Sequence, residues 1–375
     1  MQTLNLEAMG EAAIVNRGNL YRLKKVINRA KNGESLVLGF LGGSITQGSL
    51  ATKPELCYAA LVADWWEKRF PQASFTYVNA GVGGTTSHFG LARVEEDLLS
   101  KKPDFVVIEF SVNDDANEHF KETYECLIRR ILKEDDSPAI LLLHNMFYND
   151  GKSAQKEHAQ VGTYYELPCI SILDSVYPQI LNGTIERREI TPDDLHPNDA
   201  GHQLLCNMVT YFLEKVTCES NQEEEAVIGL KPPITHNHYA VTKRYQNYNC
   251  QPEVDGFLAD SEPKTAVYDN FKRGWYARQE GARLVFHVTG TELAIQYRKT
   301  IHRPAPIAIA ILDGDEEHAV TLDANFNEDW GDCLYLEEIG TNRKEREHTV
   351  EIRITHATKE NCSDFYVVSL ITGEG

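Results

Sequence analysis

The feature that most constrains this chain is a series of short, almost wholly apolar runs in its first part. They lie at 36–41, 75–80, 105–110, 139–144 and 169–173. Their content of Val, Ile, Leu and Phe is typical of strands that are buried on both faces. Amphipathic stretches separate the runs and predict helices, at 20–30, 57–70, 87–100, 118–134, 153–166 and 199–216. Strands that alternate with helices predict an α/β domain whose parallel sheet lies between two layers of helices.

The pattern changes after a charged stretch, CESNQEEEAVIGLKPP, at 218–233. Beyond it, short segments alternate apolar and polar residues and are separated by Gly or Asp/Asn turns. They read ARLVFHVTG, TELAIQYRK, APIAIAILDG, HAVTLDA, CLYLEEIG, HTVEIRITH and DFYVVSLITG. Such a series predicts an antiparallel β-sandwich, here of the jelly-roll kind. We therefore expect an α/β domain at 1–217, a linker at 218–232 and an all-β domain at 233–375.

The net charge of the chain limits the kinds of partner that it is expected to bind. The chain has 375 residues, with 37 Lys and Arg against 56 Asp and Glu, a formal net charge of -19. Nucleic acids and anionic membrane surfaces require a positive patch, so we expect neither as a partner. The sequence is compatible with an oligomer but does not define one. It shows no apolar span of transmembrane length and no basic segment followed by an apolar block at its start, so we expect a cytoplasmic protein.

The cysteines and most of the histidines do not form a metal-binding pattern. The 8 cysteines occur singly, without a C-x-x-C pair, which favours free thiols over a disulfide or zinc framework. His88, His119, His144 and His158 have no metal-like spacing, and His202 is expected on the helix behind the site described next. We therefore expect no metal and no cofactor.

Four polar stretches each follow a predicted strand or precede the last predicted helix. They are GGSIT with Ser44, NAGVGGTTS with Gly84, SVNDD with Asn113, and TPDDLHPNDAGH with Asp193 and His196. A parallel sheet brings such loops together at the carboxyl ends of its strands. A serine hydroxyl becomes an effective nucleophile when an imidazole takes its proton and a carboxylate orients that imidazole. The tetrahedral oxyanion needs fixed donors, such as backbone N–H groups or a side-chain amide.

Each stretch taken alone also has a structural interpretation. A Gly-Gly-Ser turn is usually structural, and Asn-Asp after a strand is usually a helix cap. D-x-x-H-P fits a helix N-terminus in which Asp193 or Asp194 is the cap and Pro197 lies in the first turn. The spacing favours Asp193 over Asp194 as the carboxylate that orients the histidine. The combination of all four stretches, in order, favours a serine esterase site.

The four stretches resemble, in order and spacing, the four sequence blocks of the SGNH (GDSL-type) hydrolases. This resemblance implies a flavodoxin-like three-layer fold, with Ser44 as nucleophile, His196 as base and Asp193 as its orienting carboxylate. It also implies that the oxyanion is held by the backbone N–H groups of Ser44 and Gly84 and by the amide of Asn113.

The chain departs from the family pattern at two positions. Gly43 stands where the family usually has aspartate, and Ser111 stands where many members have glycine. Neither departure removes a catalytic group, and both are expected to reshape the floor of the site.

The predicted β-sandwich suggests a carbohydrate substrate, because sugar rings stack on exposed aromatic faces. Trp275, Tyr276 and Trp330 stand in polar, turn-like contexts and are candidates for such contacts, although each is equally expected to close the end of the sandwich. The two-domain arrangement resembles the acetyl-mannan esterases of carbohydrate esterase family 17, which carry a C-terminal family 35 carbohydrate-binding module. This implies removal of acetyl groups from mannooligosaccharides.

Two rival functions remain open. One is a short-chain acyl thioesterase or lysophospholipase on the same scaffold. The other is a carbohydrate-binding protein with a vestigial esterase site.

Overall fold

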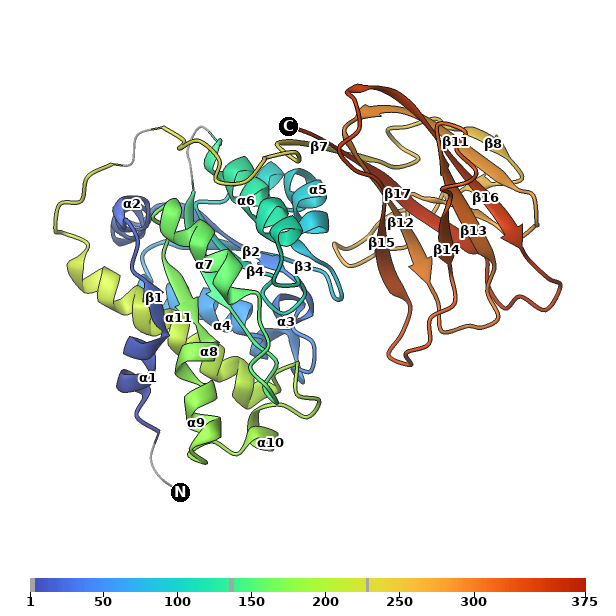
Figure 1. The fold of residues 1–375 in the computed structure, drawn as a ribbon. Coiled ribbons are helices and arrows are strands. Elements are labelled where there is room, and N and C mark those ends of the chain that lie inside the picture. Colours follow the sequence, from blue (N-terminus) through green and yellow to red (C-terminus); the bar gives the residue numbers. More distant parts are fainter. Residues whose placement is uncertain (1–3, 135–137, 227–228) are drawn as a thin grey trace. The chain divides into compact units, whose positions relative to one another are not determined.

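The computed structural model describes residues 4–134, 138–226 and 229–375, and the chain divides into two compact units, Met1–Thr235 and His236–Gly375. The first unit combines helices and strands and the second is built from strands (Figure 1). The prediction of an α/β domain followed by an all-β domain is therefore confirmed.

The first unit contains a six-stranded sheet with the order β1-β6-β5-β4-β2-β3. Its strands are β1 (Ile14–Asn16), β2 (Ser35–Gly42), β3 (Ser74–Gly81), β4 (Phe105–Glu109), β5 (Ala139–His144) and β6 (Cys169–Ser171). The five predicted strands, β2 to β6, are all parallel. The short β1 was not predicted and adds an antiparallel edge. The order β3-β2-β4-β5-β6 is the flavodoxin-like arrangement.

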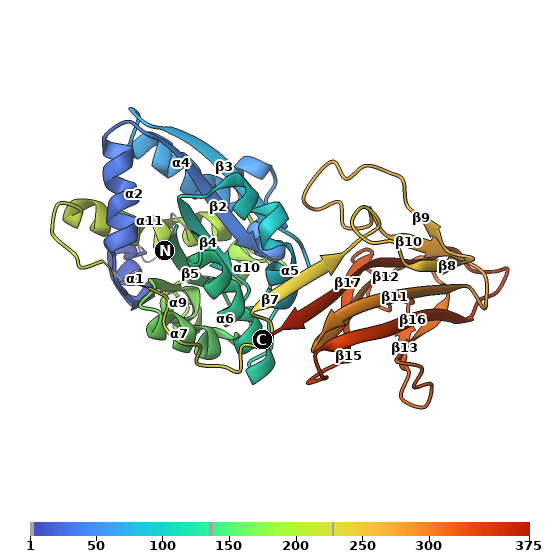
Figure 2. The same cartoon turned by 90° about the horizontal axis from the view of Figure 1, so that it is seen from above.

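Helices cover both faces of this sheet (Figures 1 and 2). They are α1 (Leu6–Ala13), α2 (Tyr21–Lys31), α3 (Ser44–Gln47), α4 (Tyr58–Arg69), α5 (Ser87–Asp97), α6 (Glu118–Leu132), α7 (Gln155–Tyr164), α8 (Ile172–Ser175), α9 (Tyr177–Leu181), α10 (Arg187–Ile190) and α11 (Asp199–Glu219). One apolar core joins α1, α2, α4 and α11 to alternate residues of the strands, such as Phe105 and Val107 of β4. Val106 and Ile108 of the same strand, also buried, point to the opposite face. Within the described residues, the helices are too short or too polar for any of them to be a candidate membrane span.

Lys231 of the predicted linker and residues just after that linker are attached to the first unit. The guanidinium of Arg129 donates to the carbonyl of Lys231 at 2.6 Å. The carboxylate of Glu125 accepts from the backbone N–H groups of Ile234 and Thr235, both at 2.8 Å. Helix α11 also continues to Glu219, past its predicted end. The division between the two units falls after Thr235, three residues beyond the end of the predicted linker at 232.

The second unit consists of two antiparallel sheets. Its strands are β7 (Val241–Tyr245), β8 (Glu253–Asp255), β9 (Leu258–Ala259), β10 (Trp275–Ala277), β11 (Arg283–Gly290), β12 (Glu292–Lys299), β13 (Ile307–Leu312), β14 (Val320–Asp323), β15 (Cys333–Gly340), β16 (Arg346–His356) and β17 (Phe365–Glu374). One sheet has the order β15-β12-β17-β10-β9, with β7 also paired to β17, and the other has the order β14-β13-β16-β11-β8. Apolar side chains from strands of both sheets, including Phe286, Ile295 and Val367, form one core. All seven predicted strands are present, and the four between 241 and 277 were missed.

Candidate active site

Ser44 lies where the strand order of the first unit reverses. From β2 the chain passes to β3 on one side and then to β4 on the other side of β2. In doubly wound sheets, ligands bind at this switch point, beyond the carboxyl ends of the strands. Gly43 follows β2, and Ser44 begins the short helix α3 with 7% of its surface exposed.

The structure brings His196 and Asp193 together with Ser44. The Nε2 atom of His196 lies 2.8 Å from the Oγ atom of Ser44. The Nδ1 atom of His196 lies 2.7 Å from Oδ2 of Asp193. A neutral imidazole that donates from Nδ1 to the carboxylate presents the lone pair of Nε2 to the hydroxyl. This is the geometry in which an imidazole can take the serine proton.

Asp193 is also held by the backbone. Its Oδ1 atom accepts from the N–H groups of His196 at 2.7 Å and Leu195 at 3.0 Å. Burial alone raises the pKa of the Asp193 carboxyl, but the hydrogen bonds from His196 and Leu195 outweigh burial, so the pKa lies below its usual value. The carboxylate is therefore ionised at neutral pH and stabilises the imidazolium that forms during proton transfer.

Asp194 has a different environment. Its carboxylate lies 3.0 Å from Nε of Arg187 and 2.9 Å from a terminal nitrogen of Arg188. Its backbone has a φ of 68°, in the left-handed region. With both oxygens paired to arginines, Asp194 shapes the loop before α11, and Asp193 is the carboxylate at the imidazole.

The second polar stretch lies against α3. The side-chain amide of Asn79 donates to the carbonyl of Thr46 at 2.8 Å, and the N–H of Gly83 donates to Oε1 of Gln47 at 2.6 Å. A Cβ built on Gly83 would lie 3.6 Å from Cβ of Ser44, so this loop runs beside the nucleophile. Gly84 has a φ of 67°, which a residue with a side chain adopts only with strain. The role of the Gly84 N–H as an oxyanion donor stays a prediction.

The third polar stretch is held in place by Asp114, the residue after Asn113. The N–H of Asp114 donates to the carbonyl of Phe110 at 2.9 Å. The buried Asp114 carboxylate accepts from the N–H of Ser87 at 2.8 Å and lies 3.1 Å from Nε2 of His158. These contacts fix the loop that carries Asn113 to the first turn of α5 and to α7.

Gly43 provides the space that the Asn113 amide occupies. A Cβ built on Gly43 would lie 2.2 Å from Oδ1 of Asn113 and 3.0 Å from its Cγ, far inside van der Waals contact. Among the described residues, Oδ1 of Asn113 is buried without a hydrogen-bond partner. Because Oδ1 lies against Gly43, the absence of the aspartate that is usual in the family has a steric consequence at the Asn113 amide.

A buried residue behind the site, Arg93 of α5, was not predicted from the sequence. Its guanidinium donates to the carbonyls of Ala80, at 2.7 Å, and Gly42, at 3.1 Å. The available signal was an arginine four residues before Asp97 on a predicted helix. Such a pair more often marks an exposed helix surface.

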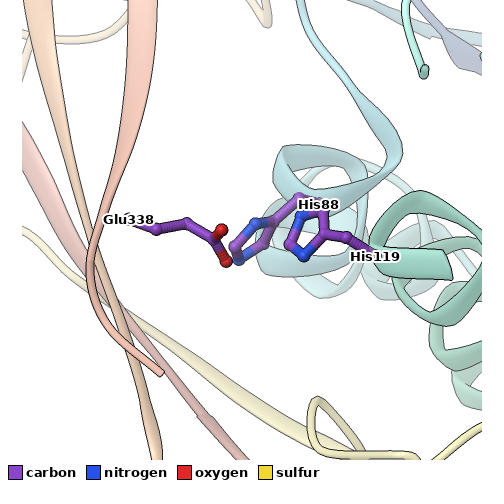
Figure 3. A group of neighbouring side chains, drawn as sticks. All are labelled: His88, His119 and Glu338. Carbon is purple, nitrogen blue, oxygen red and sulfur yellow. The ribbon is translucent and has the colours of Figure 1, made fainter. Parts of the chain in front are cut away.

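His88 and His119 lie together, and Figure 3 shows their rings, which come from α5 and α6. The ring centroids are 5.3 Å apart with the planes inclined at 59°. Burial first, and then the neighbouring His119, lower the pKa of His88 to about 3, so its ring is neutral at pH 7. Glu338, also labelled in the figure, belongs to β15 of the second unit, where the hydroxyl of Tyr239 donates to it at 2.9 Å.

His202 is buried in α11, as expected, and holds two backbone groups. Its Nδ1 atom accepts from the N–H of Tyr58 at 3.2 Å, and its Nε2 atom lies 3.2 Å from the carbonyl of Ser49. Burial lowers the pKa of His202 to about 4. This histidine joins α4 and the loop after α3 to α11.

The three candidate aromatic residues of the second unit differ in exposure. Trp275 is only 2% exposed and packs in the core, where its ring meets Phe286 edge-on at 5.2 Å. The expectation that Trp275 stacks on a sugar does not fit this position, because its strand β10 directs the indole inward. Tyr276, next in the strand, is half-buried and lies parallel to Tyr366, with ring centroids 6.5 Å apart. Trp330 is 58% exposed.

A serine, an imidazole and a carboxylate in hydrogen-bonding sequence, beside loops that offer amide donors, define the site of a serine ester hydrolase. The sequence pattern of the GDSL-like Lipase/Acylhydrolase family matches residues 40–204 of the chain, which include all four polar stretches up to His202. The chain belongs to this family and is a carboxylic ester hydrolase.

Among solved structures, the chain is similar over both units to a two-domain esterase (CEX) active on acetylated mannans. It is 52% identical to that protein over 97% of this chain and 98% of the other, with a TM-score of 0.95. A structure of CEX co-crystallized with mannopentaose matches over the same shares, with a TM-score of 0.93.

Two curated proteins are each similar to about half of the chain. An acetylxylan esterase of Geobacillus stearothermophilus is 26% identical over 50% of this chain and 96% of its own length. The thioesterase 1/protease 1/lysophospholipase L1 of Escherichia coli (strain K12) is 24% identical over 45% of this chain and 78% of its own length.

Proposed function

We propose that this protein is a serine carbohydrate esterase that removes O-acetyl groups from acetylated oligosaccharides, with acetylated mannooligosaccharides as its substrates. The observation that carries the proposal is the alignment of Ser44, His196 and Asp193, with contacts of 2.8 Å and 2.7 Å. The choice of substrate is supported by the similarity, over both units, to an esterase active on acetylated mannans.

In the first half of the reaction, Oγ of Ser44 attacks the acetyl carbonyl while Nε2 of His196 takes its proton. The N–H groups of Ser44 and Gly84 and the Nδ2 amide of Asn113 hold the oxyanion of the tetrahedral intermediate. The imidazolium of His196, stabilised by Asp193, then protonates the departing sugar oxygen as the carbon–oxygen bond breaks. This leaves an acetyl group on Ser44 and a free sugar hydroxyl.

In the second half, water takes the place of the sugar oxygen. Nε2 of His196 removes a proton from the water as its oxygen attacks the acetyl-serine carbonyl, and the same donors hold the new oxyanion. Collapse of the intermediate releases acetate, and the imidazolium returns its proton to Oγ of Ser44. The chain's own residues thus supply every proton transfer in the cycle.

The sugar is the part of the proposal that most needs a direct test. Acetate release is measured with acetylated mannan, xylan and pectin fragments at matched acetyl concentration, using the full chain and its Ser44→Ala variant. We expect the fastest release from the mannan fragments and none above background from the variant. Preference for xylan or pectin fragments would replace the mannan assignment, and full activity of the Ser44→Ala variant would refute the serine mechanism.

A chain-length series separates the proposed acetylesterase from a thioesterase or lysophospholipase. We expect para-nitrophenyl acetate to be hydrolysed faster than the octanoate ester, because the proposed leaving acyl group has two carbons. Faster hydrolysis of octanoyl esters or thioesters would favour the rival activity.

We also propose that the second unit contributes sugar contacts and that the protein works in the cytoplasm. The first proposal is supported by the exposed indole of Trp330 and the partly exposed ring of Tyr276. The second is supported by the cysteines, all eight of which are free thiols. Cell fractionation tests the location directly, and recovery of the enzyme outside the cytoplasm would reject it.

A further inference from the structure

Arg93 is a buried cation that the proposed reaction does not use. Its side chain is 0% exposed, and its guanidinium carbon lies 5.4 Å from the centre of the Phe89 ring. Burial of a cation is costly unless the cation is paired and hydrogen-bonded. The groups that the Arg93 guanidinium contacts therefore indicate what the residue does.

The guanidinium of Arg93 joins two backbone carbonyls and one carboxylate. Its Nη1 atom donates to the carbonyl of Ala80 at 2.7 Å and to Oδ2 of Asp97 at 3.1 Å. Its Nη2 atom donates to the carbonyl of Gly42 at 3.1 Å. Gly42 is the last residue of β2 and Ala80 is the last but one of β3. The guanidinium thus spans the carboxyl ends of two neighbouring strands.

Both strand ends lead directly into the site. Gly42 lies two residues before Ser44, and Ala80 lies four residues before Gly84. In the part of the chain that the structure describes, β3 is an edge strand paired only with β2. The N–H of Val82 donates to the carbonyl of Gly42 at 3.0 Å, so this carbonyl accepts from both the loop after β3 and Arg93. Arg93 therefore adds a second attachment where the edge strand ends and the donor loop begins.

We propose that Arg93 is a positioning residue that fixes the spacing between the backbone donors of Ser44 and Gly84. The inference rests on the esterase function proposed above. The guanidinium is a planar fork with donors at fixed separation, so it can hold two carbonyls in one geometry, whereas a lysine ammonium is a single point. Misplacement of a catalytic group by about 1 Å can cost on the order of 100-fold in rate.

The test is Arg93→Lys in the full chain, with kcat and KM measured on para-nitrophenyl acetate. We expect kcat to fall by about 100-fold while KM changes by less than about threefold, because the oxyanion donors act on the transition state rather than on bound ester. Circular dichroism and the thermal midpoint report whether the variant is folded. Wild-type turnover tests the esterase function separately, since an inactive wild type would reject that function before Arg93 is considered.

Two control variants separate positioning from general loss of stability. Asp97→Asn removes the buried ion pair but leaves both carbonyl contacts of Arg93 available. Arg129→Lys removes a guanidinium contact to a carbonyl, that of Lys231, elsewhere in the same unit. We expect both controls to have lower thermal midpoints but to keep kcat within about threefold of wild type.

Three results would overturn the inference. The first is a folded Arg93→Lys variant with wild-type kcat, and the second is a loss of kcat in Asp97→Asn as large as that in Arg93→Lys. The third is a failure to fold of both Arg93→Lys and Arg93→Gln. Arg93→Gln offers one amide donor and is measured in the same way if Arg93→Lys does not fold. Failure of both variants to fold would show that the contacts serve the fold as a whole and would reject a specific positioning role.

Discussion

A methyl group at position 43 should disable the side-chain donor of the oxyanion hole. In Gly43→Ala, the new Cβ would lie 2.2 Å from Oδ1 and 3.0 Å from Cγ of Asn113 if nothing moved. An ordinary carbon–oxygen contact is about 3.5 Å, so the amide must shift by about 1 Å or turn away. Complete loss of one oxyanion donor costs about 100- to 1000-fold in kcat, or about 2.7–4 kcal/mol, and a 1 Å misplacement costs on the order of 100-fold. We expect Gly43→Ala to lose about 100-fold in kcat on para-nitrophenyl acetate with little change in KM.

A double-mutant cycle with Asn113→Ala tests the reasoning. Asn113→Ala alone should lose on the order of 100- to 1000-fold in kcat. In that background the amide is absent, so the methyl group at position 43 has nothing to displace, and Gly43→Ala should cost less than about threefold more. Additive losses would refute the steric explanation, because the methyl group would then act on another part of the site. Wild-type kcat in Gly43→Ala alone would refute it as well.

Three further predictions concern other parts of the molecule. Asp193→Asn should lower kcat by on the order of 10,000-fold in a folded protein, measured with the same ester, because the amide no longer fixes the imidazole tautomer. Burial raises the pKa of the Glu109 carboxyl to about 8, so between its ordinary pKa and pH 8 the folded state holds a proton that the unfolded state releases. The stability that this group contributes is thus present at low pH and lost as pH rises. In urea unfolding, the free energy of unfolding of Glu109→Gln should therefore rise relative to that of wild type by up to about 4 kcal/mol between about pH 5 and pH 8. A difference in unfolding free energy between Glu109→Gln and wild type that stayed the same at every pH would contradict this prediction. Trp330→Ala should weaken mannopentaose binding by about 5- to 10-fold in calorimetric titration, while Trp275→Phe, a core substitution, should leave the affinity unchanged in folded protein.

Much of the fold was predictable because the periodicity of short sequence segments indicates the strands. The five parallel strands are continuous apolar runs, and seven strands of the second unit alternate apolar and polar residues, so their periods are visible without tertiary information. The strands at 241–277 are short, and they exist through pairing with other strands, as β7 and β10 pair with the longer β17. No local period marks such strands. The inward direction of Trp275 likewise depends on pairing, with Val367, so the sequence left its two expected roles open.

The candidate site was predictable as a set of residues but not as a geometry. Ser44, Asp193 and His196 stand in short motifs whose order is informative, and the sequence also showed that Gly43 departs from the family pattern. What that departure does depends on the direction of a Cβ toward Asn113, 70 residues later in the chain. The contacts of Arg93 likewise join residues from two strands and one helix. Contacts of this kind are set by tertiary packing alone.

The two sides of the site are held in different ways, and their tasks explain the difference. On the donor side, buried contacts fix the loops: Arg93 at the strand ends and Asp114 with His158 under the Asn113 loop. On the base side, the side chains of His196 and Asp193 are 22% and 44% exposed. Oxyanion donors stabilise developing charge without reorganising only if they are already in place, which requires rigid support.

The imidazole has the opposite requirement. Nε2 of His196 must exchange Oγ of Ser44 for the departing sugar oxygen and then for water, so a small freedom of movement is useful. We therefore expect substitutions beneath the donor loops to lower kcat at nearly constant KM. Substitutions in the 191–198 segment that spare Asp193 and His196 should instead alter KM and kcat together, because we expect substrate to enter beside that segment.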